Sequence, residues 1–458
     1  MKSEATWYVA AQAWVRGAWA RDVLLGVGAD GCWTHVEPQA SAAQQTPAVR
    51  LSGPVLPGVV NAHSHAFQRA IVGLTERRDP RVPSDDFWSW RDRMYAAANS
   101  ITPEQLEVIA TQLYGELLAG GYTQVCEFHY LHNALGGAPY AESAEMALAL
   151  VRAARRTGIG LTLLPTLYMR AGFAQPALRE DQRRFASTPE GIARMVEVVQ
   201  RHTREDSTIN VGVAIHSLRA VPAAALKELA AFAAQADLPV HIHIAEQTQE
   251  VDDCLVHTGM RPIEWLLHHV DVDARWNLVH ATHTTRDELV GVQARGASVV
   301  ICPATEANLG DGVFDLPGFG ALQGRWSIGS DSHVNRRWSE ELRLLEYSQR
   351  LTQRKRNRAA QAFGGTSTAA ALLQGALRGG SAASARALGG IAVGQRADFC
   401  VLDAQSSALL GIAADYVLDA LVFSSPDAGF DAVYVAGQRV QPLPEPRFAP
   451  TLHDLWGG

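Results

Sequence analysis

The sequence predicts an α/β protein, a TIM-like (β/α)8 barrel with a small β-sandwich domain built from both termini. Three observations predict it. Eight short apolar runs recur between residues 54 and 331, with helical stretches between them. Both ends of the chain instead alternate apolar and polar positions, as strands with one buried face do. The length of 458 residues exceeds what one hydrophobic core usually supports, so a smaller partner domain is expected beside the barrel.

The eight runs are rich in apolar and β-branched residues, and alanine- and leucine-rich stretches follow them. Strands buried on both faces have this composition, and repeated βα units close into a barrel. The runs cover residues 54–65, 121–128, 160–168, 209–216, 238–245, 276–282, 297–304 and 326–331. We expect the barrel at 54–385 and the two parts of the small β domain at 1–53 and 386–458, the latter with strands at 397–404 and 431–440.

Composition indicates the kind of partner. A formal net charge of −7 argues against nucleic acid or an anionic membrane as the main ligand, because either would require a basic face. The chain contains no uninterrupted apolar run long enough to span a bilayer, and its five cysteines include no C-x-x-C pair. We therefore expect a soluble cytoplasmic protein that acts on a small molecule.

Two histidines end the first apolar run. His63 and His65 lie in NAHSHAFQRA, and in an extended segment residues i and i+2 point to the same side, so both imidazoles can reach one metal ion. Taken alone, an H-x-H is as readily a pair of polar surface residues. Partners at other strand ends are needed to favour the metal site.

Such partners occur at three further strand ends. His243 and Glu246 fall at the end of the fifth run, His280 at the end of the sixth and Asp331 at the end of the eighth. Barrel enzymes keep their chemistry at the carboxyl ends of the strands, where ligands from several strands converge. His241, one step deeper in the fifth run, is expected to be a histidine of the barrel core.

The residue types favour one zinc ion. No lysine ends the fourth run, where His216 and Arg219 stand instead, so a two-metal site bridged by a carboxylated lysine is not expected. Nitrogen ligands with one carboxylate favour zinc, although iron or manganese also accepts such a set. The chain has neither H-E-x-x-H nor P-C-x-x-C, the motifs of helical zinc proteases and of cytidine-deaminase sites.

Further side chains are candidates for holding a substrate. They are Gln68, Tyr130, Arg219 and Arg91, the last in an expected loop, DDFWSWRDRMY. Two arginines directed at one cavity suit a substrate with carboxylates, because the guanidinium fork matches that geometry. A structural ion pair is the alternative for either arginine.

At these motifs the chain resembles the amidohydrolase superfamily, and within it the deiminases that act on N-formimidoyl-L-glutamate. The resemblance covers nearly the whole chain. Its most specific pieces are NAHSHAFQRA (61–70), CEFHYLH (126–132), IHSLRAV (215–221), PVHIHIAEQ (239–247), LVHATH (278–283), TEANLGDG (305–312) and IGSDSHV (328–334).

The resemblance implies a hydrolase of histidine degradation that converts N-formimidoyl-L-glutamate and water to N-formyl-L-glutamate and ammonia, with one Zn²⁺ per chain. We also expect a homodimer. The implied zinc ligands are His63, His65, His243 and Asp331. The implied catalytic pair is His280 and Glu246, and we expect Asp331 to act with them in moving the proton of the water. The implied substrate-binding residues are Gln68, Arg91, Tyr130, His216 and Arg219.

Two other functions remain open. A deaminase of a ring amine, such as guanine or another purine or pyrimidine, would use the same metal core but would not need two arginines for carboxylates. A non-catalytic scaffold built on the same barrel would be expected to lose metal ligands, whereas all four are present in this chain.

Overall fold

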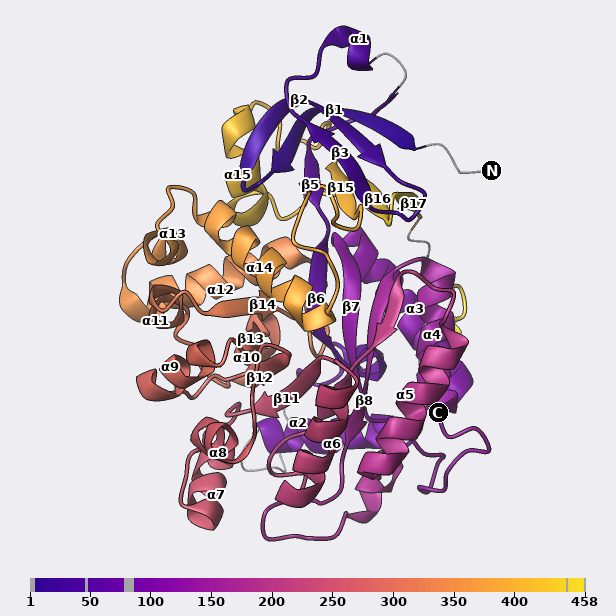
Figure 1. The fold of residues 1–458 in the computed structure, drawn as a ribbon. Helices are drawn as coiled ribbons and strands as arrows, with labels where there is room; N and C mark the ends of the chain where they lie inside the picture. Colours follow the sequence, from indigo (N-terminus) through magenta and orange to yellow (C-terminus); the bar gives the residue numbers. More distant parts are fainter. Residues whose placement is uncertain (1–4, 46–47, 78–85, 442–443, 457–458) are drawn as a thin grey trace.

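A ring of parallel strands forms the centre of the molecule (Figure 1). The computed structural model describes residues 5–45, 48–77, 86–441 and 444–456. Along the ring the strands follow chain order, each parallel to its neighbours, and the short β9 (Ile209–Val211) pairs with β8 outside this order. The ring strands are β6 (Val59–Ser64), β7 (Tyr122–His129), β8 (Gly160–Leu167), β10 (Val213–Ile215), β11 (Val240–Ile244), β12 (Trp276–His280), β13 (Ser298–Ile301) and β14 (Arg325–Ile328). The expected (β/α)8 barrel is confirmed.

The barrel closes between its first and last strands. Ser64 and Asp331 form an isolated parallel bridge. The Asp331 amide donates to the His63 carbonyl at 3.0 Å, and the His65 amide donates to the Asp331 carbonyl at 3.3 Å. The backbone that joins the two edges of the barrel therefore also carries three of the expected metal ligands.

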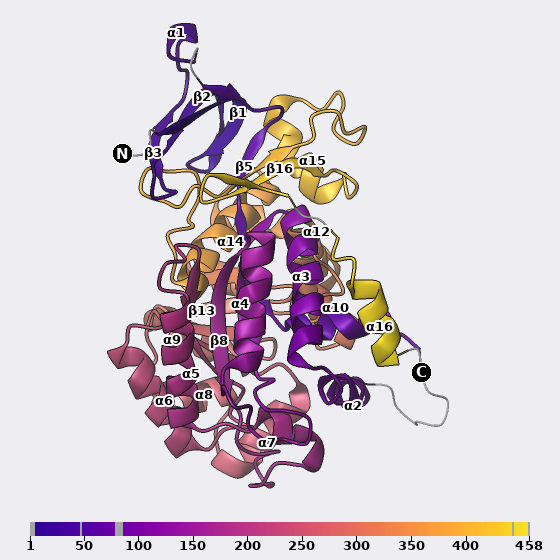
Figure 2. The ribbon, with the colours of Figure 1, turned by 90° about the vertical axis from the view of Figure 1, so that its right-hand side faces the viewer.

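Helices surround the strands (Figures 1 and 2). Those of the barrel segment are η1 (Ala66–Ile71), α2 (Phe87–Ala98), α3 (Pro103–Ala119), α4 (Glu145–Thr157), η2 (Glu180–Phe185), α5 (Pro189–His202), α6 (Ala223–Gln235), α7 (Thr248–Thr258), α8 (Pro262–His269), α9 (Arg286–Ala294), α10 (Pro303–Leu309), α11 (Leu316–Ala321), α12 (Trp338–Gln353), α13 (Arg358–Phe363) and α14 (Thr368–Ser384). Helix α14 packs against both β6 and β14. The helix approaches β14 closely at Gly379, because glycine has no Cβ. A Cβ at this position would lie only 1.8 Å from the Trp326 carbonyl oxygen.

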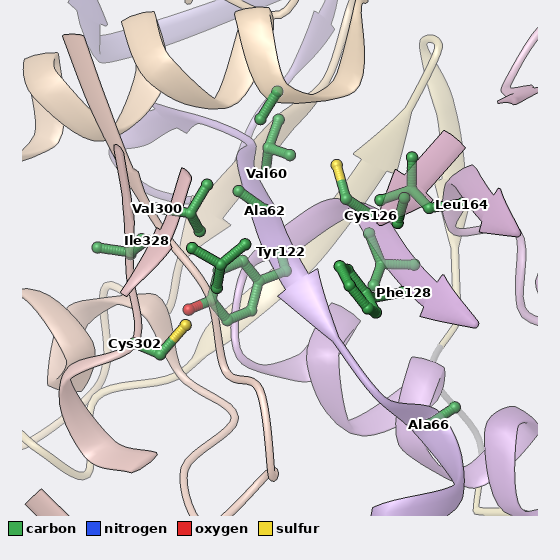
Figure 3. Packing of buried hydrophobic residues seen from close by; sticks show 14 of the residues in the cluster. Val60, Ala62, Ala66, Tyr122, Cys126, Phe128, Leu164, Val300, Cys302 and Ile328 are labelled. Carbon is green, nitrogen blue, oxygen red and sulfur yellow. The ribbon is translucent and has the colours of Figure 1, made fainter. Parts of the chain in front are cut away.

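Apolar side chains fill the barrel and the space beneath its helices. Figure 3 shows members of this core from several strands, among them Val60 and Ala62 on β6 and Ile328 on β14. Every residue of β7 and β8 is buried, as expected for parallel strands covered on both faces. His241 is buried in this core, as expected, and its Nε2 is hydrogen-bonded to the Ala383 carbonyl at 2.9 Å.

Both termini build the second sheet, which confirms the expected small β domain. Its strands run in the order β17-β16-β15-β5-β1-β2-β3, and β4 pairs with β1. They are β1 (Thr6–Val15), β2 (Ala18–Val27), β3 (Trp33–Glu37), β4 (Val49–Arg50), β5 (Val55–Pro57), β15 (Phe399–Leu402), β16 (Phe430–Val435) and β17 (Gln438–Val440), with the short helix α1 (Ala42–Gln45) between β3 and β4. This sheet has a hydrophobic core of its own, in which the rings of Phe399 and Tyr434 stack with their centroids 4.2 Å apart.

The structure differs from the sequence expectation at the first apolar run and in the C-terminal segment. The run 54–65 is two strands in different sheets, because the chain turns at Gly58, where a Cβ would lie 2.3 Å from the Thr123 hydroxyl. The C-terminal segment also returns to the barrel: α15 (Val417–Phe423), which follows η3 (Ala414–Tyr416), packs on α12 and α14, and α16 (Phe448–Trp456) packs on α3. Across the described ranges, no helix has both the length and the apolar character needed to cross a bilayer.

Candidate active site

Three histidine rings and one carboxylate meet at the end of the barrel where β6, β11 and β14 finish. His63 Nε2 lies 3.1 Å from His65 Nε2 and 3.0 Å from His243 Nε2, and His65 Nε2 is 3.3 Å from His243 Nε2. Asp331 Oδ1 is 3.4 Å from the Nε2 atoms of His63 and His65. All four side chains are buried. The structure thus brings together the residues expected as metal ligands.

This cluster has the chemistry of a cation site. His65 Nδ1 faces the Phe128 carbonyl at 2.9 Å, and His243 Nδ1 faces the His216 carbonyl at 3.0 Å. A ring nitrogen that is hydrogen-bonded to a carbonyl must carry the proton, so the Nε2 atoms of His65 and His243 present lone pairs toward His63. Burial, and then the neighbouring imidazoles, keeps the pKa of His63 and of His243 well below 6.5. Converging lone pairs beside a carboxylate fit a divalent metal ion.

Beside the cluster lie two groups that can exchange protons. His280 Nε2 is 3.6 Å from Glu246 Oε1 and 3.8 Å from Asp331 Oδ2. Burial disfavours protonation of His280, but the surrounding carboxylates, led by Glu246, outweigh it and raise its pKa to about 10. Burial raises the pKa of Glu246 to about 7, against the opposing effect of His280. Glu246 can therefore hold or release a proton near neutral pH.

The strand ends that carry these groups turn sharply. Ala245, His280, Ala281 and Asp331 all have positive φ angles, between 47° and 68°. This backbone conformation costs a non-glycine residue about 1–3 kcal/mol and persists only where the surrounding structure enforces it. It lets the chain leave each strand while the side chains stay directed at the barrel axis.

One cavity above the cluster is lined by every expected site residue except His63, which lies beneath it. Gln68, Tyr130 and His216 form part of its wall, and Gln68 Nε2 donates to the Tyr130 hydroxyl at 3.4 Å. Arg91 and Arg219 complete it. Within the described residues, buried nitrogens of both guanidinium groups, Arg91 Nε and Arg219 Nη1, have no hydrogen-bond partner. The cavity therefore offers cationic donors to an anionic ligand.

Arg91 lies on a helix, which corrects the expectation of a loop. Asp86 caps α2 by accepting hydrogen bonds from the Trp88 and Ser89 amides, and such a cap starts a helix. The Arg91 guanidinium then sits over the rings of Trp88 and Tyr95, 4.5 and 5.4 Å from their centroids. Arg91 is thus held by packing on a regular element.

Several lining residues were not anticipated from the sequence. Phe87, Trp90, Met94 and Tyr95 flank the cavity on α2 together with Arg91. Their i, i+3, i+4, i+7, i+8 spacing is a helical signal that could have identified this face. Glu250 also lines the cavity, four residues after Glu246, and accepts the Ala245 and Glu246 amides at 3.1 Å each. Ser217 and Leu309 complete the lining.

Comparison with known proteins gives the class. The model of the amidohydrolase family matches residues 55–440, and the chain belongs to this family. The chain is 46% identical to the formimidoylglutamate deiminase of Pseudomonas aeruginosa over 92% of its own length and 91% of that protein's. It is 28% identical to the 8-oxoguanine deaminase of the same organism over 72% of its length and 69% of that protein's.

Solved structures agree with the fold. An amidohydrolase from Brucella melitensis superposes with a TM-score of 0.91 at 42% identity, over 98% of this chain and 99% of that one. An adenosine deaminase from Xanthomonas campestris with bound zinc superposes with a TM-score of 0.78 at 22% identity, over 99% and 97% of the two chains. The second likeness extends to the fold alone.

Proposed function

We propose that this chain is a zinc-dependent deiminase that hydrolyses N-formimidoyl-L-glutamate to N-formyl-L-glutamate and ammonia. One observation carries the choice of substrate: two guanidinium groups with unpartnered buried donors face the same cavity as the histidine cluster. A dicarboxylate of this size needs such partners, because a desolvated carboxylate without one is costly. The similarity to a formimidoylglutamate deiminase over most of both chains supports the same substrate.

His63, His65, His243 and Asp331 would hold the zinc ion. When bound there, the ion lowers the pKa of a coordinated water and polarises the reacting carbon–nitrogen bond. Zinc is favoured because nitrogen atoms dominate the ligand set. In this proposal the same four residues bind a single ion per chain.

The substrate's two ends would meet different walls of the cavity. Arg219, on the turn that follows β10, and Arg91, on α2, would bind the carboxylates of the glutamate end. Tyr130 and Gln68, joined by their hydrogen bond, and His216 would orient the formimidoyl end toward the metal ligands. His216 suits this place because its ring packs against that of His243, 5.1 Å away between centroids.

Protons would move through Glu246, His280 and Asp331. The attacking water loses a proton as its oxygen bonds to the formimidoyl carbon, and the Asp331 carboxylate is placed to take it, oriented by the His280 ring 3.8 Å away, which the surrounding carboxylates keep protonated. The nitrogen that departs as ammonia must gain a proton, and Glu246, with its pKa of about 7, can supply one. The carbon–nitrogen bond of the protonated formimidoyl group then breaks, ammonia leaves, and the remaining hydroxyl proton passes to the Glu246 carboxylate as the carbonyl of the formyl group forms.

Ammonia release from two substrates tests the proposal. Purified zinc-loaded protein should release ammonia from N-formimidoyl-L-glutamate and much less from guanine, because guanine leaves both arginines without an anionic partner. Faster release from guanine would contradict the proposed substrate and indicate a ring amine instead. Absence of release from either, with zinc bound, would favour the non-catalytic alternative. A homodimer and a cytoplasmic location remain predictions, tested by sedimentation and by cell fractionation.

A further inference from the structure

The TEANLGDG segment, residues 305–312, forms most of α10 and the turn after it, and it touches the elements that carry the proposed proton-transfer groups. Thr305 Oγ1 accepts the Ser332 amide at 3.1 Å and lies 3.3 Å from the Ser330 carbonyl, so it holds the residues on both sides of Asp331. Asp311 accepts a hydrogen bond from Gln247, the neighbour of Glu246. The third contact, from Glu306, reaches a reacting side chain itself.

Glu306 lies behind the ring of His280. Its Oε1 is 3.3 Å from His280 Nδ1 and accepts the Cys302 amide at 2.8 Å. The His280 side chain is 1% exposed and that of Glu306 is 5% exposed, so water does not compete for this contact. A carboxylate oxygen can only accept, which places a proton on Nδ1. Nε2 is then the nitrogen that faces Glu246 and Asp331.

The backbone does not fix this ring by itself. His280 has a φ of +68°, a conformation that needs support from surrounding contacts. The amide of Cys302, at the start of α10, fixes the Glu306 carboxylate, and the carboxylate in turn fixes the ring. This is the arrangement by which a carboxylate commonly orients a working imidazole.

A second cation site is the other use of this cluster, since His280, Cys302 and Glu306 place ligand atoms within 4.8 Å of one another. The contacts argue against it. Glu306 Oε1 already accepts a backbone amide, and burial keeps the pKa of the Cys302 thiol well above 9.0, so the thiolate that a metal prefers is disfavoured.

We propose that Glu306 is a positioning residue of the reaction: it holds the proton of His280 on Nδ1 and directs Nε2 at Glu246, Asp331 and the substrate. This inference rests on the proposed function for its kinetic consequence only. Glu306 touches neither substrate nor metal ligands in this role, so its loss should lower kcat while substrate affinity and zinc content persist.

Two variants and a matched control test it. Glu306→Leu removes the acceptor and the charge, whereas Glu306→Gln keeps an oxygen that can accept from Nδ1 but carries no charge. Glu341→Gln is the control, because Glu341 is a buried carboxylate that accepts the Ala304 amide of the same helix at 2.9 Å and does not contact His280. It should reproduce any loss of thermal stability from disturbing α10 without the catalytic effect.

Relative to the control, Glu306→Leu should lower kcat by about 10- to 100-fold, the usual effect of removing such an orienting partner, with KM and zinc content unchanged. Glu306→Gln should fall between wild type and Glu306→Leu. A kcat for Glu306→Leu equal to that of Glu341→Gln would overturn the proposal, as would a loss carried entirely by KM.

A spectroscopic measurement keeps this inference separate from the proposed function. In ¹⁵N-histidine-labelled protein, the proton on His280 Nδ1 should appear at low field because of its carboxylate acceptor, and it is assigned by its absence from His280→Gln. It should move upfield or vanish in Glu306→Leu and persist, shifted less, in Glu306→Gln. An unchanged signal in Glu306→Leu would overturn the inference. If wild type fails to act on N-formimidoyl-L-glutamate, the substrate proposal falls, whereas this measurement needs no substrate.

Discussion

Replacing Arg219 by methionine should abolish most of the preference for a carboxylate substrate. Methionine retains much of the side-chain length but removes the charge and the Nη1 donor, which is buried and without a partner in the described residues. A hydrogen bond to a charged group contributes about 1.5–3 kcal/mol, which corresponds to a loss of roughly 10- to 150-fold in kcat/KM. Ammonia release from N-formimidoyl-L-glutamate measures it, with zinc content determined in parallel and expected to stay at the wild-type level.

A matched arginine and a pair of substrate analogues sharpen the test. Arg179→Met is the control, because Arg179 pairs with Asp181 and does not line the cavity. Two analogues, each with a different carboxylate of the substrate converted to an amide, complete a double-mutant cycle with Arg219→Met. For the analogue that lacks the carboxylate bound by Arg219, the loss of kcat/KM seen with wild type should disappear in Arg219→Met. Full activity of Arg219→Met, or equal loss in Arg179→Met, would refute the assignment of Arg219 as an anchor.

Three further predictions concern the metal, the proton donor and pH. Native protein should contain about one equivalent of zinc by elemental analysis, because the four ligands close one site, and His243→Ala should lose it; two tightly bound equivalents would contradict a single-ion site. Glu246→Gln should keep its zinc and lose about 10²- to 10⁴-fold in kcat, so near-normal turnover would exclude Glu246 from proton transfer. Burial, and then the charge of Glu246, raises the pKa of Asp311 from 3.8 to about 9. The contribution of this carboxyl group to the free energy of unfolding is therefore fully present below pH 3.8, the ordinary pKa, and is lost as pH rises through about 9. Asp311→Asn should therefore show a smaller fall in Tm than wild type between neutral and alkaline pH, and an equal fall would contradict this origin.

The barrel strands and the metal cluster were predictable because both depend on short-range patterns. Strand ends in a parallel barrel share one rim, so reading where each apolar run stops was enough to place His63, His243, His280 and Asp331 near one another. The structure brings the same residues within hydrogen-bonding distance or a little beyond.

Features that depend on distant neighbours were not predictable. The run 54–65 reads as one strand, because continuous apolar residues do not reveal that the chain passes against Thr123 at Gly58 and there moves from one sheet to the other. The helix that carries Arg91 is a different case, because its signal, the cap at Asp86, is local and the aromatic-rich segment obscures it. The contact of Glu306 with His280 joins separate βα units, and no periodicity within one segment specifies it.

The closure of the barrel has a consequence for how the protein folds and opens. Asn61 and Ser330, 269 positions apart in the chain, exchange hydrogen bonds of 2.7 and 2.9 Å across the junction of β6 and β14. Such long-range pairing forms late, because the intervening chain must first be ordered. The residues proposed to hold zinc lie on both sides of this junction, so the ion can be captured only by the closed ring and stabilises that state by mass action. Amide hydrogen exchange around residues 61–65 and 329–333 should consequently be faster in the metal-free protein, whereas exchange in β8, on a distant part of the ring, should change far less.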